Sequence, residues 1–259
     1  MDIDFECTIC GDCCRKFKLP LTVAEAVDWL RAGREVQVFC EAIPWRYEPP
    51  HDDKLAAYKR ARSFAATSAS LPMRVLPLLV APIPGACPHL QPDNRCAIYA
   101  RRPLVCRIYP AEINPFLELQ PEHKACPSDA WTPGRPALQR RGVLVDAHLQ
   151  TLIESARASA VADVPVKAAV CAALGLAAAS LANEGYAVYT PERAALLAAL
   201  LAGEAQAEHG AAPPPTHWRF VSNRRATVDA LAEIGATSAL VDAQPAALEF
   251  EYLGFYPAA

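Results

Sequence analysis

The alternation of hydrophobic and polar positions predicts a chain built mostly of helices. Thr22 and Glu25 form a Thr-x-x-Glu capping box, and the apolar residues after it recur at helical spacing until Gly33. Similar patterns predict helices in five further segments: 54–64, a long helix from 136, 165–183, 191–208 and 224–234. Strand-like alternation is short and weak, and it occurs in three segments: 35–40, 237–242 and 247–253. The pattern therefore favours helices with a minor sheet.

Prolines interrupt this pattern at two places. Residues 71–86 are proline-rich, so we expect an extended segment that leads to Cys87. The run Ala-Ala-Pro-Pro-Pro at 211–215 predicts a linker or an abrupt turn.

Composition narrows the classes of protein to consider. Hydrophobic residues make up 53% and charged residues 20% of 259 residues, which is typical of a globular protein. The net charge of −3 gives no bulk basic field, so general nucleic-acid binding is not expected. The acidic N-terminus shows no secretory signal and no long uncharged apolar run occurs, so we expect a cytoplasmic protein without a membrane span.

The candidate chemistry lies in the cysteines. Four thiols fall within residues 7–14, in the sequence Cys-Thr-Ile-Cys-Gly-Asp-Cys-Cys. A Cys-x2-Cys spacing lets two thiolates converge on one metal, and the series Cys7, Cys10 and Cys13 has the spacing of an iron–sulfur motif. Ten cysteines without a secretory signal indicate metal binding more than disulfides. Cys40 and Cys171 lie in apolar segments and are expected to be core residues.

A second set of thiols, Cys87, Cys96, Cys106 and Cys126, lies far downstream, and prolines follow two of them. The segment 96–110 reads Cys-Ala-Ile-Tyr-Ala-Arg-Arg-Pro-Leu-Val-Cys-Arg-Ile-Tyr-Pro. Together with Phe-x-Cys-x2-Cys-x2-Cys-Cys near the N-terminus, it resembles the YkgJ-type cysteine-cluster family, also called the CxxCxxCC zinc- or iron-chelating domain. The resemblance covers about residues 5–127. It implies a metal site, and related clusters in flagellin lysine N-methylases supply one enzymatic precedent.

The predicted metal ligands are eight cysteines: Cys7, Cys10, Cys13, Cys14, Cys87, Cys96, Cys106 and Cys126. We expect them to converge, because each set alone is a poor chelator while together they supply two four-thiolate centres. A triple Cys-x2-Cys-x2-Cys with a remote Cys-Pro is close to the bacterial ferredoxin arrangement, which favours an iron–sulfur cluster. Zinc is the alternative, although the second set lacks a Cys-x2-Cys knuckle.

Polar partners for the site are predicted at four positions: Tyr99, Arg102, Arg107 and Tyr109. Their alternative role is charge compensation and packing around the thiolates.

Three functional classes fit this site. It is an iron–sulfur component of a reaction that modifies a peptide or small molecule, a module that chelates zinc or iron, or a structural metal domain. Whether the protein is an enzyme stays open, and so does its oligomeric state. No glycine-rich nucleotide motif and no nucleophile triad is visible.

The predicted fold class is mainly α with short β elements (α+β). Residues 1–135 are expected to form a metal-nucleated, cysteine-rich domain, and 136–259 an Ala-rich helical region with a short α/β tail. The tail is rich in aromatic residues and contains Arg219, Arg224 and Arg225. It is expected either to cover helices or to form one wall of a pocket with Trp45 and Tyr109.

Overall fold

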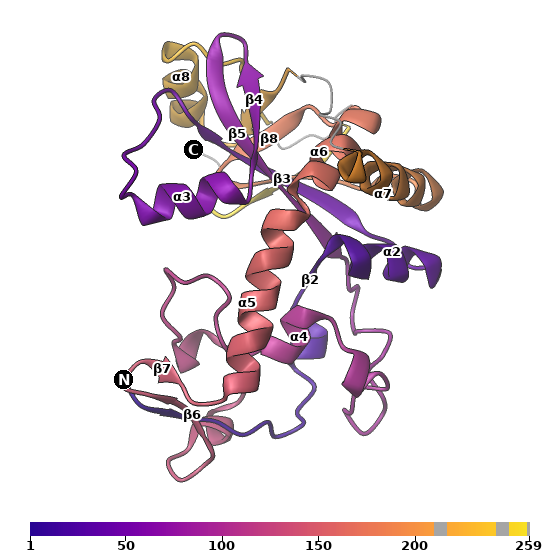
Figure 1. Cartoon of the computed structure of the whole chain (residues 1–259), viewed down its shortest axis with the longest axis vertical. Coiled ribbons are helices and arrows are strands. Elements are labelled where there is room, and N and C mark those ends of the chain that lie inside the picture. The colour runs from indigo at the N-terminus through magenta and orange to yellow at the C-terminus, as the bar shows by residue number, and fades with distance from the viewer. Residues whose placement is uncertain (210–216, 242–248, 258–259) are drawn as a thin grey trace. The chain divides into compact units, whose positions relative to one another are not determined.

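The chain folds into two compact units in a computed structural model that describes residues 1–209, 217–241 and 249–257. The predicted linker at 211–215 lies outside the described residues. Each unit combines segments that are distant in sequence. The first consists of Met1–Leu21 and Pro82–Ser159, and the second of Thr22–Ala81 and Ala160–Ala259 (Figure 1).

The first unit contains short elements joined by long loops. Its strands are β1 (Ile3–Asp4), β2 (Leu19–Leu21), β6 (Ala137–Arg140) and β7 (Val143–Leu144). Its helices are α1 (Cys13–Lys16), α4 (Leu104–Ile108) and α5 (Ala147–Ala162, whose last turn belongs to the second unit), with 3-10 turns at Tyr99–Arg101, Pro121–His123 and Ser128–Trp131. Strands β1, β6 and β7 form a small antiparallel sheet, which ties the N-terminus to residues 137–144.

An apolar cluster holds much of the first unit together. Ile108 at the end of α4 is 1% exposed, and it packs with Leu138 of β6 and with Leu152 and Ile153 of α5. Phe5 and Trp131 extend the cluster, with ring centroids 4.6 Å apart. The helix that contains Cys106 is therefore fixed by apolar packing at Ile108, although the thiol itself is only half-buried.

The second unit is built on a mixed sheet. Its strands are β3 (Gln37–Pro44), β4 (Phe64–Ser68), β5 (Leu71–Ala81), β8 (Ala178–Leu181), β9 (Gly185–Tyr189), β10 (Arg219–Ser222), β11 (Ser238–Leu240) and β12 (Glu251–Gly254). The order β11-β10-β8-β3-β5 runs across the sheet, with β4 paired to β5 and β12 paired to β9. The pairs β11–β10, β10–β8 and β8–β3 are parallel, whereas β5 and β9 run antiparallel to β3.

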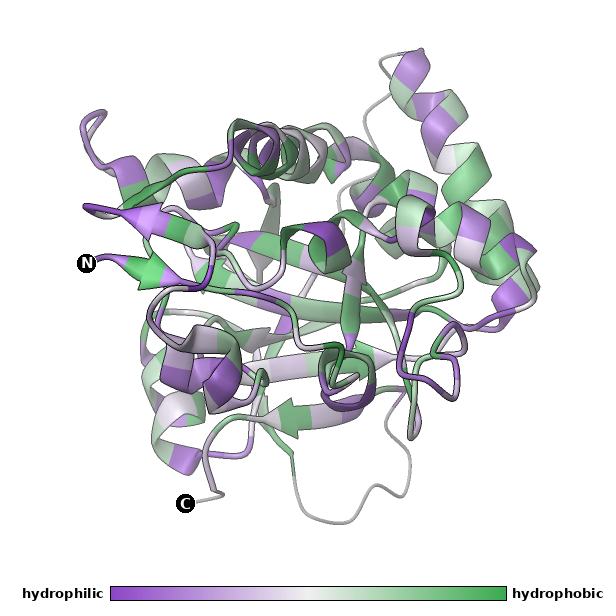
Figure 2. Cartoon of the chain, turned by 90° about the horizontal axis from the view of Figure 1, so that it is seen from below, coloured by the Kyte–Doolittle hydropathy of each residue, from purple (hydrophilic) through white to green (hydrophobic). Residues whose placement is uncertain are grey.

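Five helices belong wholly to this unit: α2 (Val23–Arg31), α3 (Lys54–Ala61), α6 (Val164–Ala173), α7 (Arg193–Glu208) and α8 (Arg225–Glu233). Helix α7 packs against α6 and α2, as Figure 1 shows, while α8 packs on β10 and β11. Helix α2 begins at the predicted capping box, because the Thr22 hydroxyl accepts from the Glu25 amide and the Glu25 carboxylate accepts from the Thr22 amide. In Figure 2 hydrophobic residues are concentrated along the long strands, which form the core.

The prediction of a mainly α protein is wrong, because the structure is a mixed, sheet-rich fold. The long helix expected from residue 136 is instead the β6–β7 hairpin followed by α5, and the helix expected over 165–183 ends at Ala173 before β8. The extended segment 71–86 contains an eleven-residue strand, β5. Alanine favours helices, yet Ala178 and Ala179 are buried between β3 and β10, where sheet packing decides. The Ala-rich C-terminal half is therefore not a helical region.

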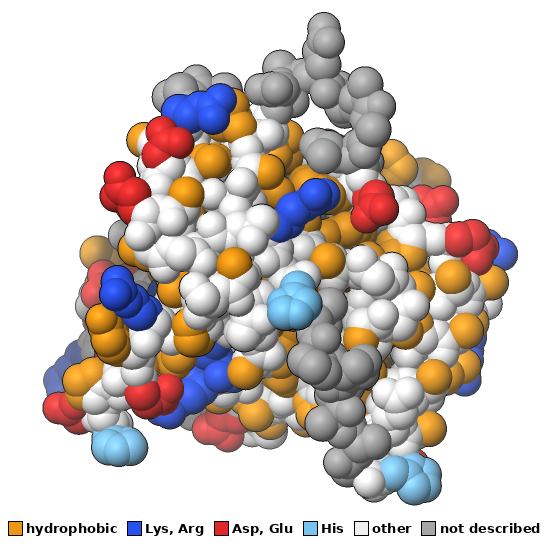
Figure 3. All heavy atoms as spheres, turned by 90° about the horizontal axis from the view of Figure 1, so that it is seen from above, with side chains coloured by type: hydrophobic (Ala, Val, Ile, Leu, Met, Phe, Trp, Pro, Cys, Tyr) orange, Lys and Arg blue, Asp and Glu red, His pale blue; other side chains and the backbone are white. Residues whose placement is uncertain are grey.

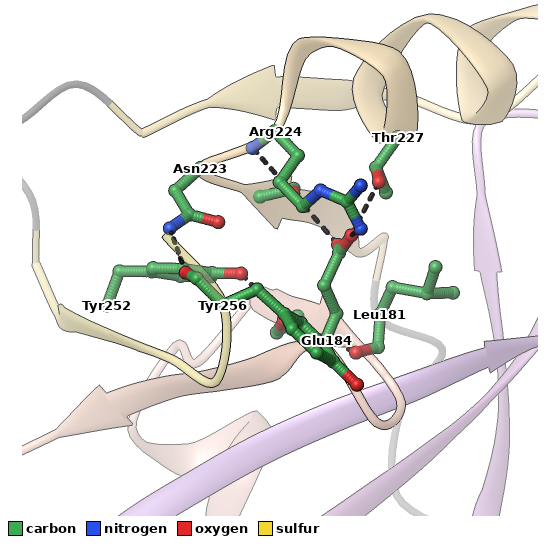
Figure 4. A network of polar contacts seen from close by, with 9 residues as sticks. Leu181, Glu184, Asn223, Arg224, Thr227, Tyr252 and Tyr256 are labelled. Atoms are coloured by element: carbon green, nitrogen blue, oxygen red, sulfur yellow. Dashed lines mark hydrogen bonds and ion pairs between the residues drawn. The ribbon is translucent and has the colours of Figure 1, made fainter. Parts of the chain in front are cut away.

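A buried carboxylate joins three elements of the second unit (Figure 4). Glu184, between β8 and β9, accepts hydrogen bonds from Ser222 of β10 at 2.8 Å and from Thr227 in the first turn of α8 at 2.5 Å. Its side chain is 7% exposed, and the Arg224 guanidinium lies 3.5 Å away. A carboxylate at this place also interacts favourably with the N-terminal end of the helix dipole.

The backbone of the same loop is closed by the C-terminal strand. The Phe255 amide donates to the Glu184 carbonyl oxygen at 2.9 Å. A Cβ added at Gly185 would lie 2.6 Å from the carbonyl oxygen of Leu253, so only glycine allows β9 and β12 to approach this closely.

Among the described residues, no helix is both long enough and apolar enough to cross a membrane.

Candidate metal centre

The N-terminal cysteine loop is held at both ends. Before it, the Glu6 amide donates to the Ala130 carbonyl oxygen at 3.0 Å, next to the Phe5–Trp131 contact. Within it, Ile9 and Gly11 have φ angles of 57° and 74°, which turn the backbone sharply between Cys7 and Cys13. The Asp12 amide points at the Cys10 Sγ at 3.5 Å, so the turn directs a backbone donor at a sulfur. Helix α1 then begins at Cys13.

Arg15 braces this loop against the second cysteine segment. Its guanidinium donates to the Cys10 carbonyl oxygen at 3.0 Å and to the Asn94 Oδ1 at 2.6 Å. A Cβ on Gly11 would lie 2.5 Å from Arg15 Nη1, so the glycine provides both the positive φ and the space for this brace.

The downstream cysteines are presented by a compact loop and by α4. The Cys87 amide donates to the Cys14 carbonyl oxygen at 2.7 Å, which joins the two segments directly. An isolated antiparallel bridge pairs Leu90 with Cys96, and α4 then places Cys106 one turn after Pro103. Cys126 follows a 3-10 turn, beside Tyr109.

All eight predicted cysteines lie in the first unit, and each thiol interacts with at least one other of the set. The Sγ atoms of Cys13 and Cys14 are 4.0 Å apart, and the Cys14 thiol contacts Cys87. Cys106 lies within electrostatic range of Cys13, Cys87 and Cys96. Cys126 lies within range of Cys7, Cys10 and Cys13.

Crowding and burial shape the protonation of these thiols. The hydrogen bond from the Cys14 thiol lowers the pKa of Cys13 to about 7. The same bond raises the pKa of Cys14, with the contact to Cys87 as a second cause. Burial raises the pKa of Cys106 to about 12, and burial also raises the pKa of Cys126. Ionising the whole set thus requires positive charge nearby.

Two of the four predicted polar partners interact with the thiols. The Cys126 thiol donates to the Tyr109 hydroxyl oxygen at 3.6 Å, and that oxygen also accepts from the Ala125 amide at 2.8 Å. The positive charge of Arg102 lowers the pKa of Cys13 and of Cys106, as a lesser cause in each.

The other two lie further from the chemistry. Tyr99 is 65% exposed and stacks under the Arg102 guanidinium, 3.7 Å from its ring centroid. Arg107 is half-buried in α4, and its amide donates to the Pro103 carbonyl oxygen at 3.1 Å, but no side-chain hydrogen bond or ion pair joins it to another residue in the described part of the chain. Tyr99 therefore orients Arg102, while Arg107 has no visible role at the thiols.

The structure adds residues that the sequence pattern did not indicate. Lys124 forms an ion pair with Glu112 and lies 5.9 Å from the Tyr109 ring centroid, and its side chain is 11% exposed. Phe17 also packs against Tyr109, with its ring centroid 5.3 Å from that of Tyr109. Only the hydrophobic character of Phe17 and the position of Lys124 two residues before Cys126 were available as signals.

The thiols are close but not arranged around one point. Within the ranges that the structure describes, no three His, Cys, Asp or Glu side chains have the arrangement needed to hold a metal ion. Binding a metal with any four of these thiols therefore requires their side chains to move.

The donor chemistry fits the implied metals, because sulfur ligands suit zinc and iron–sulfur clusters. The half-buried thiols also lie beside Arg102.

Cys40 and Cys171 lie apart from this set, in the second unit. Both are 0% exposed, one in β3 and the other in α6, and their thiols contact each other. Burial raises the pKa of Cys40 well above the ordinary value.

Comparison with known proteins gives one match. No significant match to the chain was found among curated proteins or among solved structures. Residues 6–127 match the family model CxxCxxCC, described as "Putative zinc- or iron-chelating domain". The resemblance to the CxxCxxCC domain is thereby confirmed, and the matched segment contains all eight clustered thiols. Over residues 6–127 the chain is thus similar to the CxxCxxCC family of zinc- or iron-chelating domains.

Proposed function

We propose that the first unit binds metal through its eight clustered cysteines and that one of its two centres is an iron–sulfur cluster. The observation that carries this proposal is the position of Cys126. Its thiol lies within electrostatic range of Cys7, Cys10 and Cys13, although 112 residues lie between it and Cys13, the nearest of the three in sequence. A Cys-x2-Cys-x2-Cys series with one remote Cys-Pro is the ligand pattern of bacterial four-iron clusters.

The remaining thiols supply a second set of four: Cys14, Cys87, Cys96 and Cys106. Cys14 contacts Cys87 through both backbone and thiol, and Cys106 lies within range of Cys87 and Cys96 as well as of Cys13 from the first set. Cys13 and Cys14 are adjacent and belong to different sets in this division, which explains why the pair occurs. Their Sγ atoms lie 4.0 Å apart, so serving separate centres requires the two thiols to turn away from each other when metal binds.

The protein side chains have defined roles in this proposal. A bound metal would supply positive charge that stabilises the thiolates, so its binding releases protons. Arg102 offsets part of the thiolate charge, and Tyr109 can donate to Cys126 once that sulfur is ionised. The Arg15 brace keeps the two segments together.

Elemental analysis and absorption spectroscopy of the anaerobically purified chain test the proposal. The expected result is bound iron with acid-labile sulfide and a broad visible absorption band. A colourless protein with bound zinc would leave the thiol sites in place and refute the cluster. A chain that holds neither metal after reconstitution would refute metal binding altogether.

Single substitutions test the division into two sets. Cys126→Ser should remove the iron–sulfur absorption while metal at the second set remains, and Cys96→Ser should do the reverse. Cys171→Ser is the matched control, because this thiol is buried in the second unit and should leave metal content unchanged. Loss of all metal from both cluster variants would show one shared centre instead of two.

A finer step concerns what the centre does. Participation in a reaction that modifies a peptide or small molecule rests on the precedent of the related methylases, whereas chelation alone needs only the donor set, so chelation is the function we favour. Turnover of a lysine-containing peptide by the metal-loaded chain would overturn the choice of chelation.

A cytoplasmic location is proposed because free thiols and iron–sulfur clusters persist in reducing surroundings.

A further inference from the structure

The polar groups around the Cys126 thiol are half-buried and joined to one another. On the face drawn in Figure 3, by contrast, acidic and basic side chains are scattered among apolar ones at the surface, where solvent and salt screen their charges. The Lys124 side chain is 11% exposed, and that of Glu112, its ion-pair partner, is 27% exposed. Tyr109 and Cys126 are half-buried as well. A hydrogen bond in such surroundings is stronger than one in water.

A backbone donor orients the Tyr109 hydroxyl group. Its oxygen accepts from the Ala125 amide at 2.8 Å, so the hydroxyl hydrogen points in a different direction. The Cys126 Sγ lies 3.6 Å from the same oxygen, and in the metal-free protein the thiol donates to it. A thiolate has no proton to donate. Once Cys126 binds metal, the direction of this hydrogen bond therefore reverses, and the hydroxyl donates to the sulfur.

The aromatic ring that carries this hydroxyl is held in place by two contacts. The Phe17 ring centroid lies 5.3 Å from that of Tyr109, at an interplanar angle of 57°. The Lys124 Nζ lies 5.9 Å from the Tyr109 centroid, and the ion pair with Glu112 fixes this ammonium group. Phe17 directly follows α1, the helix that begins at Cys13, so the ring also contacts the N-terminal cysteine segment. The hydroxyl donor is thus oriented before metal binds.

We propose that Tyr109 is a positioning residue of the first set of thiols, and that its hydroxyl donates a hydrogen bond to the Cys126 sulfur when metal is bound. The first set consists of Cys7, Cys10, Cys13 and Cys126. This inference rests on the proposed function, because it needs a metal centre. The donated bond fixes the direction of the most remote ligand in sequence and weakens the electron donation of its sulfur to the metal. Since the bonded thiol belongs to the first set, Tyr109 makes the first centre differ from the second.

Cobalt titration of the metal-free, reduced full chain tests the proposal, with Co²⁺ as a coloured probe for thiolate sites. Tyr109→Phe is compared in two backgrounds, because Cys96→Ser keeps the first set intact and Cys126→Ser keeps the second. In the Cys96→Ser background, Tyr109→Phe should weaken Co²⁺ binding about ten-fold. The sulfur-to-cobalt charge-transfer band should also move to lower energy, because a sulfur that accepts no hydrogen bond releases its electrons more easily. In the Cys126→Ser background neither quantity should change.

This comparison separates a hydrogen bond to one sulfur from a general loosening of the unit. Equal weakening in both backgrounds would show a structural role and overturn the proposal, and so would an unchanged band in both. Tyr109→Phe keeps the ring that packs against Phe17 and Lys124, so the unit is expected to fold. Tyr47→Phe is the matched control, because it makes the same chemical change at a tyrosine of the second unit that is 74% exposed.

A second readout uses the iron–sulfur form of the full chain. Hydrogen bonds to the sulfurs of a cluster help to set its reduction potential, because they stabilise the negative charge that reduction adds. The midpoint potential of Tyr109→Phe should therefore be lower than that of the unaltered chain, and that of Tyr47→Phe should be unchanged. An intact cluster with an unchanged potential in Tyr109→Phe would refute the positioning role and leave the proposed function standing. A chain that binds neither cobalt nor iron would refute both.

Discussion

Replacing Glu184 by alanine should destabilise the second unit strongly. The carboxylate is almost fully buried and accepts from two hydroxyl groups, Ser222 at 2.8 Å and Thr227 at 2.5 Å. Ser222 is 0% exposed, so in the variant its hydroxyl hydrogen would lose its acceptor inside the protein. Arg224 is 41% exposed and 3.5 Å away, so its ion pair adds little because solvent screens it.

The expected cost follows from these contacts. Hydrogen bonds to a charged group contribute about 1.5–3 kcal/mol each, and an unpaired buried donor costs a further ~1–3 kcal/mol. Because contributions within one network are not additive, the free energy of unfolding should fall by about 3–5 kcal/mol. Glu184→Gln keeps the side-chain shape and one acceptor oxygen, so it should cost less than Glu184→Ala.

Urea denaturation followed by tryptophan fluorescence measures this loss. Trp218 is buried immediately before β10, the strand that contains Ser222, so its emission reports on the affected region. Glu233→Ala, at the exposed end of α8, is the control and should change stability by less than about 0.5 kcal/mol. A loss below ~1 kcal/mol for Glu184→Ala would refute the view that this carboxylate holds β8, β10 and α8 together.

Three further predictions concern the same unit. Gly185→Ala should cost about 1–3 kcal/mol in thermal or urea unfolding, because its Cβ would lie 2.6 Å from a backbone oxygen that cannot move aside; an unchanged stability would contradict the observed strand spacing. Cys171→Ala should cost about 1–2 kcal/mol by lost packing and leave metal content unchanged, as elemental analysis can check. Burial raises the pKa of Glu41, so its ionised form opposes folding and stability should increase as the pH falls through the folded-state pKa. Glu41→Gln should therefore stabilise the chain at neutral pH and flatten the pH dependence of its unfolding on the acid side, and a steeper dependence would refute this assignment.

Local signals in the sequence predicted local structure well. The capping box at Thr22 and Glu25 depends on residues three apart, and the structure has it as predicted. The sheet could not be predicted in the same way, because β3 becomes a central strand only through partners at 71–81, 178–181 and 185–189. The prolines of β5 concealed that strand. Pro77 lies beyond the part of β5 that pairs with β4, so its missing N–H costs that pairing no hydrogen bond.

The same argument applies to the candidate centre. Spacing alone identified the thiols, because Cys-x2-Cys repeats have a geometric meaning within one turn. The proximity of Cys126 to Cys10 accompanies a long-range contact of Phe5 with Trp131, which no local pattern contains. The ion pair of Lys124 with Glu112 and the brace of Arg15 on Asn94 are likewise long-range contacts between ordinary surface residue types.

Burial finally separates the two kinds of cysteine in this chain. The eight clustered thiols are half-buried or exposed, lie in loops and short helices, and include Cys13, whose pKa falls to about 7. Cys40 and Cys171 are fully buried in a long strand and a helix, where burial raises the pKa of Cys40 and excludes a solvated ion. A thiol must lose its proton to bind a metal, and in the first environment the lowered pKa of Cys13 and the nearby charge of Arg102 favour that loss. The contact between Cys40 and Cys171 is therefore packing between two small apolar side chains, despite the proximity of two sulfurs.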